Sequence, residues 1–232
     1  KIYFFFFFND TATTEIYTME VPHGEAVRLT TNEVRDGAPD WSPDGSTIAF
    51  VSSRDSGSGE LYLMASDGSD VRRLTTNERY EEVPSFSPDG RYLAFGAVTP
   101  FEEGADATLP IFLLDLETGE ETQLTHLAGH NSAPRWSPDG SLIAFYGQVG
   151  EGFEGANLLV IAPDGSGLRN VTDDVEPDWQ PDWSPDGSSI VFARGSGDPL
   201  DLWLIDPDGG GMTPLLVAEG RDEQPKWRPS RR

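Results

Sequence analysis

The stretch APDWSPDG, residues 38–45, decides the fold, because its aromatic residue and the Ser-Pro-Asp-Gly that follows recur along the chain. Three more copies are intact, and a degenerate copy, WRPS, stands near the C-terminal end. The aromatic residues of the five copies are Trp41, Phe86, Trp136, Trp183 and Trp227. The spacings between them are 45, 50, 47 and 44 residues. This period is close to the ~40–45 residues of a four-stranded propeller blade.

Each repeat divides into four short strands around two turns. In the Ser-Pro-Asp-Gly turn, Pro presets φ, Asp accepts backbone N–H bonds and Gly takes a positive φ, so a helix is excluded. The first strand ends at the aromatic residue; in the first repeat the next three strands are 46–52, 60–66 and 71–75. The second strands are continuously apolar, which indicates that both faces are buried between neighbouring sheets. We therefore expect an all-β propeller with four complete blades and interpret the recurrent aromatic residue as packing between blades.

The two ends of the chain predict a fifth blade. Residues 15–19 (EIYTM) and 26–30 (AVRLT) align without a gap with a third and a fourth strand of the repeat. The segment 224–229 supplies a lone first strand. Joining these pieces would hide exposed strand edges, as propellers usually do. We expect a composite fifth blade and a single domain over residues 15–232.

The first 18 residues resemble sequence from outside the natural gene. Residues 9–18, NDTATTEIYT, resemble the in-frame translation of a common sequencing adapter, and the five Phe of 4–8 would be translated oligo-T. We expect residues 1–14 to be a sequencing artefact and the natural protein to extend further upstream. The alternative is a real aromatic strand over residues 2–8 that is closed by an Asn-Asp turn.

The composition limits the classes of partner that the chain can bind. The chain has 40 acidic and 16 basic residues, a net charge of −24, and no Cys. This charge repels phosphate backbones and excludes nucleic acid, whereas it suits a basic peptide or a basic protein surface. Solubility alone is the alternative reason for the acidity. Disulfides and thiolate metal sites are excluded, and no apolar run approaches the roughly 20 residues that cross a bilayer.

The repeat also resembles a known family. From P-x-W-S-P-D-G through I-A-F and L-Y-x-M to D-G and L-T, over about residues 15–227, the chain is similar to TolB-type repeats, which are relatives of the tryptophan–aspartate propeller repeats. The resemblance implies a monomeric, non-catalytic propeller that binds a protein or peptide and is periplasmic or secreted in its complete form, with a signal peptide that this chain lacks. Relatives often have six or seven blades. The alternatives are a propeller enzyme, such as a polysaccharide lyase or hydrolase, and the propeller domain of a prolyl-oligopeptidase-like peptidase.

Catalytic and metal-binding patterns are sparse. The chain has no G-x-S-x-G, and its only histidines are His23, His126 and His130. The last two lie four residues apart in a loop without the Glu of H-E-x-x-H, so they are interpreted as loop residues. The nearest approach to a calcium loop is the cluster Asp173, Asp174, Glu176 and Asp178. We expect no catalytic residue, metal or cofactor.

Binding is expected on the face of the disc that carries the variable loops. The loops 100–110 and 147–156 are long, and the loops between blades differ in sequence. Variable loops on a rigid frame usually carry binding, and aromatic residues among acids suit a basic peptide. Solvated loops without a ligand are the alternative. The candidate binding residues are Tyr80, Phe101, Glu102, Glu103, Asp106, His130, Glu151, Phe153, Glu154, Asp174, Trp179 and Asp222.

Overall fold

The computed structural model describes residues 2–8, 13–20, 24–55, 57–77, 79–98, 108–127, 129–148, 155–196, 200–216 and 225–226. Its strands form five antiparallel sheets. The N-terminal sheet holds β1 (Ile2–Phe8), β2 (Thr13–Met19) and β3 (Val27–Arg28). Blade 1 holds β4 (Asp36–Trp41), β5 (Thr47–Ser52), β6 (Glu60–Ala65) and β7 (Arg72–Arg73). Blade 2 holds β8 (Tyr80–Phe86), β9 (Tyr92–Val98), β10 (Ile111–Asp115) and β11 (Glu121–Gln123). Blade 3 holds β12 (Asn131–Trp136), β13 (Ile143–Gln148), β14 (Ala156–Ile161) and β15 (Arg169–Asn170). Blade 4 holds β16 (Asp178–Trp183), β17 (Ile190–Arg194), β18 (Asp201–Ile205) and β19 (Thr213–Leu216).

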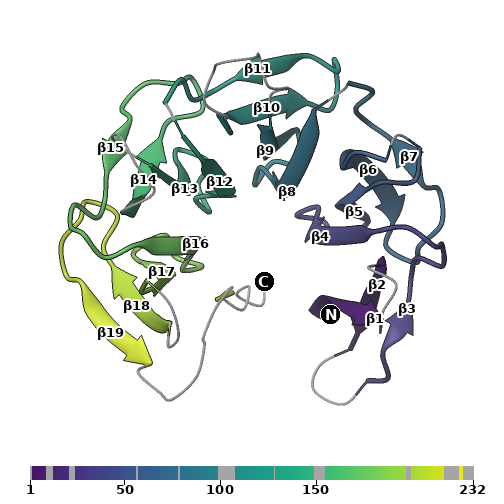
Figure 1. Ribbon diagram of the computed structural model, residues 1–232, viewed down its shortest axis with the longest axis horizontal. Helices are drawn as coiled ribbons and strands as arrows, with labels where there is room; N and C mark the ends of the chain where they lie inside the picture. The colour runs from purple at the N-terminus through teal and green to yellow at the C-terminus, as the bar shows by residue number, and fades with distance from the viewer. Residues whose placement is uncertain are drawn as a thin grey trace.

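The sheets are arranged around a common axis, as Figure 1 shows, with the first strand of each blade nearest the centre. Within each blade the strands pair with their sequence neighbours, β4-β5-β6-β7 and its equivalents. The N-terminal sheet packs on blade 1 through contacts of β1 and β2 with β4. The predicted all-β propeller with four complete blades is confirmed. Within the described ranges there is no helix long and apolar enough to cross a membrane.

The composite fifth blade is not confirmed. The fifth sheet has the order β1-β2-β3, and all three strands come from the N-terminal part of the chain. Its β2 includes residues 15–19, and β3 lies within 26–30, as the alignment with the repeat predicts. Of the expected terminal strand at 224–229, the structure describes only Pro225 and Lys226, and neither is in a strand.

The hydrophobic core is divided into clusters that lie between successive sheets. In β5, Ile48 and Phe50 pack toward Ile16 of the N-terminal sheet, while Ala49 and Val51 face the next blade. Two further clusters join blade 2 to blade 3 and blade 3 to blade 4 in the same way. Because successive residues of a strand point to opposite faces, a strand buried on both sides must be apolar throughout. This arrangement explains the continuous apolar runs.

In the four blades the recurrent aromatic residue packs between sheets, as the sequence predicts, while Trp227 lies outside the described residues. Phe86 and Trp183 are buried within inter-blade clusters, and the Trp183 Nε1–H donates a hydrogen bond of 3.0 Å to the Arg135 carbonyl of the preceding blade. Blade 1 uses a different link, in which Asp40 Oδ2 accepts a bond of 2.8 Å from the Phe86 backbone N–H. The end of each first strand is therefore fastened to its neighbour.

A Leu-Thr or Val-Thr pair follows the outermost strand of the N-terminal sheet and of blades 1 to 3, and it ties the outer part of each of these sheets together. The Thr hydroxyl accepts a hydrogen bond of 2.9 Å from a third-strand N–H in the N-terminal sheet and in blades 1 to 3. In blade 1 the same hydroxyl, on Thr75, donates to Glu81 Oε2 of blade 2 at 2.6 Å. The four threonines are Thr30, Thr75, Thr125 and Thr172.

Candidate functional site

Each first strand bends at the residue before its proline. The pairing of first and second strands shifts register at this point in all four blades, which marks a β-bulge. The bulged residue has a positive φ, between 48° and 52°, although none is Gly. A positive φ in a β-branched or bulky residue is rare, and such strain often accompanies functional sites. The bulged residues are Ala38, Val83, Ala133 and Gln180.

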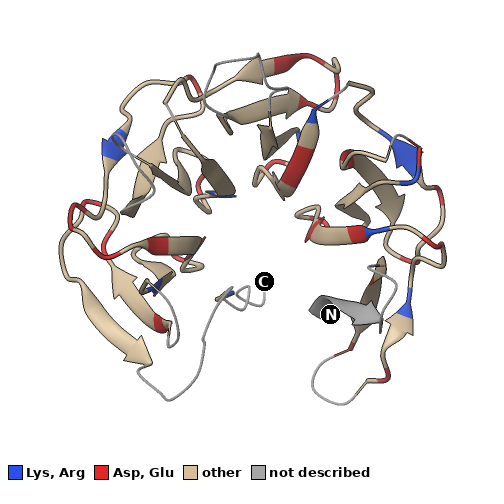
Figure 2. Ribbon diagram, in the orientation of Figure 1, with Lys and Arg blue, Asp and Glu red and all other residues tan. Residues whose placement is uncertain are grey.

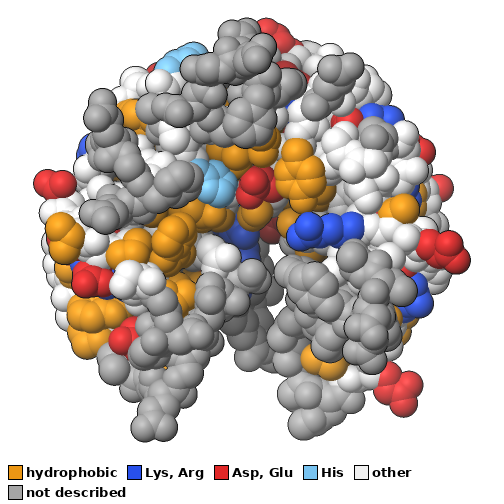
Figure 3. All heavy atoms as spheres, viewed as in Figure 1, with side chains coloured by type: hydrophobic (Ala, Val, Ile, Leu, Met, Phe, Trp, Pro, Cys, Tyr) orange, Lys and Arg blue, Asp and Glu red, His pale blue; other side chains and the backbone are white. Residues whose placement is uncertain are grey.

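The four bulges surround an axial cavity of about 640 Å³. All four bulged residues line it, together with Gly37, Glu82 and Ser132, which precede the bulges of blades 1 to 3. Figure 3 shows the hollow at the centre of one face, bordered by hydrophobic and charged side chains. A bulge re-aims neighbouring side chains, so the repeated strain gives this cavity its lining.

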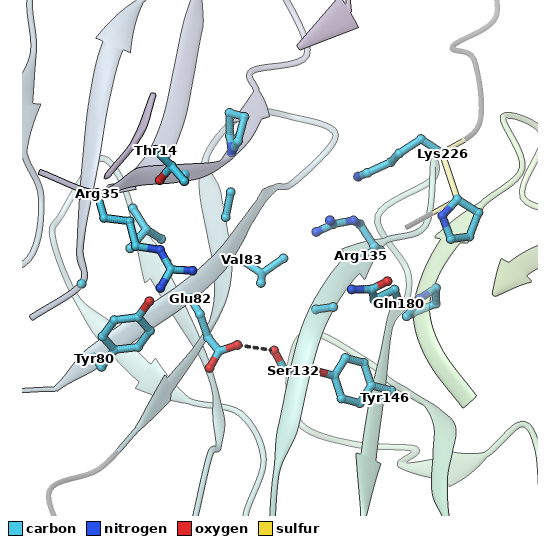
Figure 4. Close-up of a pocket in the computed structure, with 18 of the residues that line it drawn as sticks. Thr14, Arg35, Tyr80, Glu82, Val83, Ser132, Arg135, Tyr146, Gln180 and Lys226 are labelled. Atoms are coloured by element: carbon cyan, nitrogen blue, oxygen red, sulfur yellow. Dashed lines mark hydrogen bonds between the residues drawn. The ribbon is translucent and has the colours of Figure 1, made fainter. Parts of the chain in front are cut away.

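Aromatic side chains from two blades line the cavity, with Tyr80 and Tyr146 on opposite sides of Glu82 (Figure 4). Tyr80, at the start of β8, lines the cavity and is 36% exposed. It packs over Gly59, where a Cβ would come within 2.8 Å of the tyrosine ring. Tyr146 also lines the cavity, and its ring meets Trp179 edge-on at 5.3 Å and His130 edge-on at 5.9 Å between centroids. The indole of Trp179 is fixed by a hydrogen bond of 3.1 Å from Nε1 to the Gly195 carbonyl.

Glu82 is the hydrogen-bonded carboxylate of the cavity. Its Oε2 accepts a bond of 2.9 Å from the Ser132 hydroxyl, drawn in Figure 4, and its Oε1 lies 3.8 Å from His130 Nε2. Burial alone would raise the pKa of Glu82, but the contacts with His130 and Ser132 and the charge of Arg35 outweigh it and hold this pKa below its ordinary value. Glu82 is therefore a carboxylate at neutral pH.

This group does not form a hydrolytic triad. In a triad, the imidazole accepts the proton of the nucleophilic hydroxyl and the acid orients the imidazole. Here the Ser132 hydroxyl donates to the carboxylate of Glu82, and the Ser132 residue is 1% exposed. The Ser132 hydroxyl is therefore part of a hydrogen-bonded polar network and is not an activated nucleophile.

Three cationic side chains also line the cavity: Arg35 from the segment before β4, Arg135 from β12, and Lys226. Figure 4 shows the guanidinium groups of Arg35 and Arg135 pointing toward one another from opposite sides of Val83. Around the ring, by contrast, acidic residues are spread over all blades (Figure 2). The cavity thus differs in charge from the rest of the surface.

The predicted binding residues divide into three groups. Tyr80, His130 and Trp179 lie at the axial mouth, on or beside the cavity lining. Asp174 lies apart from them in an ion pair with Arg194, whose hydrogen bond lowers the pKa of this Asp. The other eight lie outside the described residues: Phe101, Glu102, Glu103, Asp106, Glu151, Phe153, Glu154 and Asp222.

The histidine pair and the acidic cluster take structural contacts. His126 Nδ1 lies 3.2 Å from Gln123 Nε2, while His130 turns toward Tyr146 and Glu82. In the acidic cluster, Asp178 is buried beside Arg194. Within the ranges that the structure describes, no three His, Cys, Asp or Glu side chains gather as a metal site.

Sequence reasoning missed Arg35, Glu82, Ser132, Arg135, Tyr146 and Lys226. The signal that points to two of them is the proline of each first strand. Glu82 and Ser132 stand two residues before it, directly before the bulge that turns the strand toward the axis. Arg35 and Tyr146 carry no comparable mark, because their place depends on how neighbouring blades pack.

The ring of four-stranded sheets and the axial cavity define a β-propeller. The chain belongs to the TolB β-propeller domain family, whose family model matches residues 4–101 and 98–232.

Solved structures of other proteins have the same fold. A putative TolB from Agrobacterium tumefaciens has a solved structure with a TM-score of 0.76 and 26% identity, covering 91% of this chain and 76% of that one. Oligogalacturonate lyase from Vibrio parahaemolyticus shares the fold at a TM-score of 0.66 and 16% identity, covering 89% of this chain and 59% of that one.

Among curated proteins, an uncharacterised protein of Agrobacterium fabrum is 31% identical over 97 residues, which is 41% of this chain and 32% of the relative. An uncharacterised peptidase of Bacillus subtilis, YuxL, is 28% identical over 144 residues, which is 62% of this chain and 14% of the peptidase. The matched region therefore spans about a third or less of these curated relatives.

Proposed function

We propose that this chain is a non-catalytic interaction propeller that binds a segment of a protein or peptide across the mouth of the axial cavity. The observation that carries the proposal is the convergence of four bulged strands on one cavity with Tyr80, Tyr146 and Trp179 at its mouth. Tyr and Trp supply large contact areas and dominate many binding interfaces. The similarity to a putative TolB supports a binding role in the periplasm or outside the cell.

The acidity of the chain supports a partner with basic residues. A net charge of −24 would speed the approach of a basic segment and would suppress binding to acidic surfaces. The aromatic mouth would then hold apolar or aromatic side chains of the segment. The expected complex contains one propeller monomer and one partner segment.

The test is selection from a peptide library on the immobilised propeller, followed by calorimetric titration of the selected peptides. Tyr80→Ala is expected to weaken binding about fivefold or more, since truncation of an anchoring aromatic residue costs more than ~1 kcal/mol. The matched control is Val27→Ala, because Val27 is 56% exposed on the distant β3.

Two outcomes would contradict the proposal: enrichment of no peptide, or equal binding by the wild type and Tyr80→Ala. Mass spectrometry of the bound peptides adds a direct check on catalysis. Cleaved products would favour a peptidase role, to which the similarity with YuxL would then be relevant.

A further inference from the structure

The charges that line the axial cavity are opposite to the charge of the whole chain. Among its described lining residues, Arg35, Arg135 and Lys226 are cationic and Glu82 is the one acid. The chain as a whole has a net charge of −24. An excess of cations at the centre of such an acidic molecule calls for a specific reason.

Arg35 is a cation without a dedicated partner. Its guanidinium forms no ion pair with any residue in the described part of the chain, and the residue is exposed. Glu82, the nearest carboxylate of the lining, already accepts the Ser132 hydroxyl and faces His130. Figure 4 shows Arg35 beside Glu82 and Tyr80, with its guanidinium directed into the cavity.

Arg135 stands at a position that varies between blades, where blade 2 has Ser85. It occupies the position that Asp40 holds in blade 1 and Asp182 in blade 4, between the proline and the aromatic residue. Asp40 fastens the next blade through the Phe86 N–H, a bond that an arginine side chain cannot accept. Nη1 of Arg135 donates to the Pro134 carbonyl at 2.8 Å, but its Nε is buried without a hydrogen-bond partner. A buried donor without an acceptor is costly. Arg135 nevertheless lines the cavity, so the accessible part of its guanidinium can meet an oxygen ligand there.

Lys226 adds a third positive group at the same end. Its side chain keeps contact with solvent. Desolvation by the surrounding atoms and the charge of Arg135 nevertheless lower its pKa, against the opposing effect of Asp40 and Asp182. An anion between Lys226 and Arg135 would offset their mutual repulsion.

We propose that the axial cavity is an anion site that takes a carboxylate, with Arg35 and Arg135 as its principal ligands. Arginine suits this ligand because its planar donors match the two carboxylate oxygens. The proposed function supplies one source, the C-terminal carboxylate of the bound segment. A uronic acid carries the same group, so the experiment must separate the two sources.

The test is titration of the isotopically labelled propeller, followed by NMR. The probes are N-acetyl-dialanine and galacturonic acid, each compared with its uncharged amide or methyl ester. The Nε–H signals of arginine report directly on the proposed ligands. Each acid that binds is expected to shift the Arg35 and Arg135 signals, whereas its uncharged counterpart leaves them in place.

The variants Arg35→Gln and Arg135→Gln are expected to weaken binding of the acid by about tenfold each, the effect of losing one charged hydrogen bond. Arg72→Gln is the control, since it removes the same charge from exposed strand β7. Because Arg35 is exposed, its substitution tests the site even where Arg135→Gln perturbs folding.

Equal binding of acids and uncharged counterparts, or an unchanged affinity in Arg35→Gln, would overturn the anion site and leave the peptide-binding function intact. Binding of galacturonic acid without N-acetyl-dialanine would support the anion site and contradict a peptide terminus as its ligand. Selected peptides that bind equally well as C-terminal amides would support the peptide-binding function. They would contradict the C-terminal carboxylate as the ligand of the anion site.

Discussion

Replacing Asp178 with Asn is expected to remove a large part of the pH dependence of stability. Asp178 begins β16 and is 0% exposed, with Arg194 Nη1 3.3 Å from its Oδ1. Burial raises its pKa to about 7, although Thr172 and Arg194 act in the opposite direction. In blade 3 the equivalent position is Asn131, also 0% exposed, so the propeller already accommodates the amide at this point.

The sign follows from the protons that each state binds. Between the unfolded pKa of 3.8 and the folded pKa of about 7, the native state holds a proton that the unfolded chain has released. Raising the pH through this window therefore lowers the free energy of unfolding. The full effect is at most about 4 kcal/mol, of which about 3 kcal/mol falls between pH 5 and pH 8. Asp178→Asn has no carboxyl group at this position, so its free energy of unfolding lacks this pH dependence. Its stability relative to the wild type should therefore rise by up to about 3 kcal/mol between pH 5 and pH 8.

Urea unfolding followed by tryptophan fluorescence at pH 5, 6, 7 and 8 measures this difference. The control is Asp36→Asn at the equivalent position of blade 1, where the carboxylate accepts hydrogen bonds from Arg54 at 2.9 Å and Asn32 at 2.6 Å. This variant should be less stable than the wild type at pH 7, because the charged partner of Arg54 is lost. A stability difference between wild type and Asp178→Asn that stays constant from pH 5 to pH 8 would refute the reasoning.

Three further substitutions test the frame by chemical denaturation. Thr75→Val should cost about 1–3 kcal/mol because it leaves a buried N–H and a buried carboxyl without their hydroxyl partner, whereas Thr122→Val on an exposed strand should change little. Gly68→Ala should destabilise more than Gly45→Ala: both have positive φ, but only at Gly68 would the new Cβ approach a backbone carbonyl, at 2.8 Å. Phe145→Ala should cost about 3–5 kcal/mol, since the ring is 0% exposed between blades 2 and 3. Equal unfolding midpoints within the threonine pair or the glycine pair, or for Phe145→Ala and the wild type, would contradict the packing.

The repeat could be predicted from sequence because its determinants are local. The turn at 42–45 and the apolar strand at 47–52 each contain the residues that fix their own conformation. Closure of the ring depends instead on pairing between segments more than 200 residues apart in a chain of 232. Local patterns contain no information on which distant strand pairs with β2, so they do not determine the composition of the fifth sheet.

The candidate site was predictable in part for a similar reason. The sequence predicts Tyr80, His130 and Trp179 on one face because loops and strand starts between blades meet there, and the structure places them at or beside the cavity. Arg135 was missed because it lies within a strand next to Trp136, where the repeat pattern indicates packing. The bulge before Pro134 lies at the cavity, but the equivalent residues Asp40, Ser85 and Asp182 follow the same bulge and do not line it, so this position is not marked by the repeat.

We propose that residues 1–14 are foreign sequence joined to the natural chain. In the structure, β1 pairs with β2 from Ile2 to Phe8, so the segment occupies the position next to β2 in the N-terminal sheet. A clean read of the gene across the codons for Thr18 and Met19 tests the proposal. Codons for a further repeat at this point would support it, whereas an in-frame run of Phe codons would make β1 a genuine strand.

The two charge patterns of this propeller can act together on one ligand. Exposed charges are screened beyond about 8–10 Å at physiological ionic strength, so the acidic periphery guides approach while the arginines act only after entry. A free anion gains from the cavity but is repelled by a molecule with a net charge of −24. A basic segment that ends in a carboxylate would gain from both patterns, because the acidic residues spread over all blades attract its basic residues while its terminus reaches Arg35 and Arg135. Raising the salt concentration should therefore slow association of such a segment, while the preference for the acid over its amide, which is set inside the cavity, should change less.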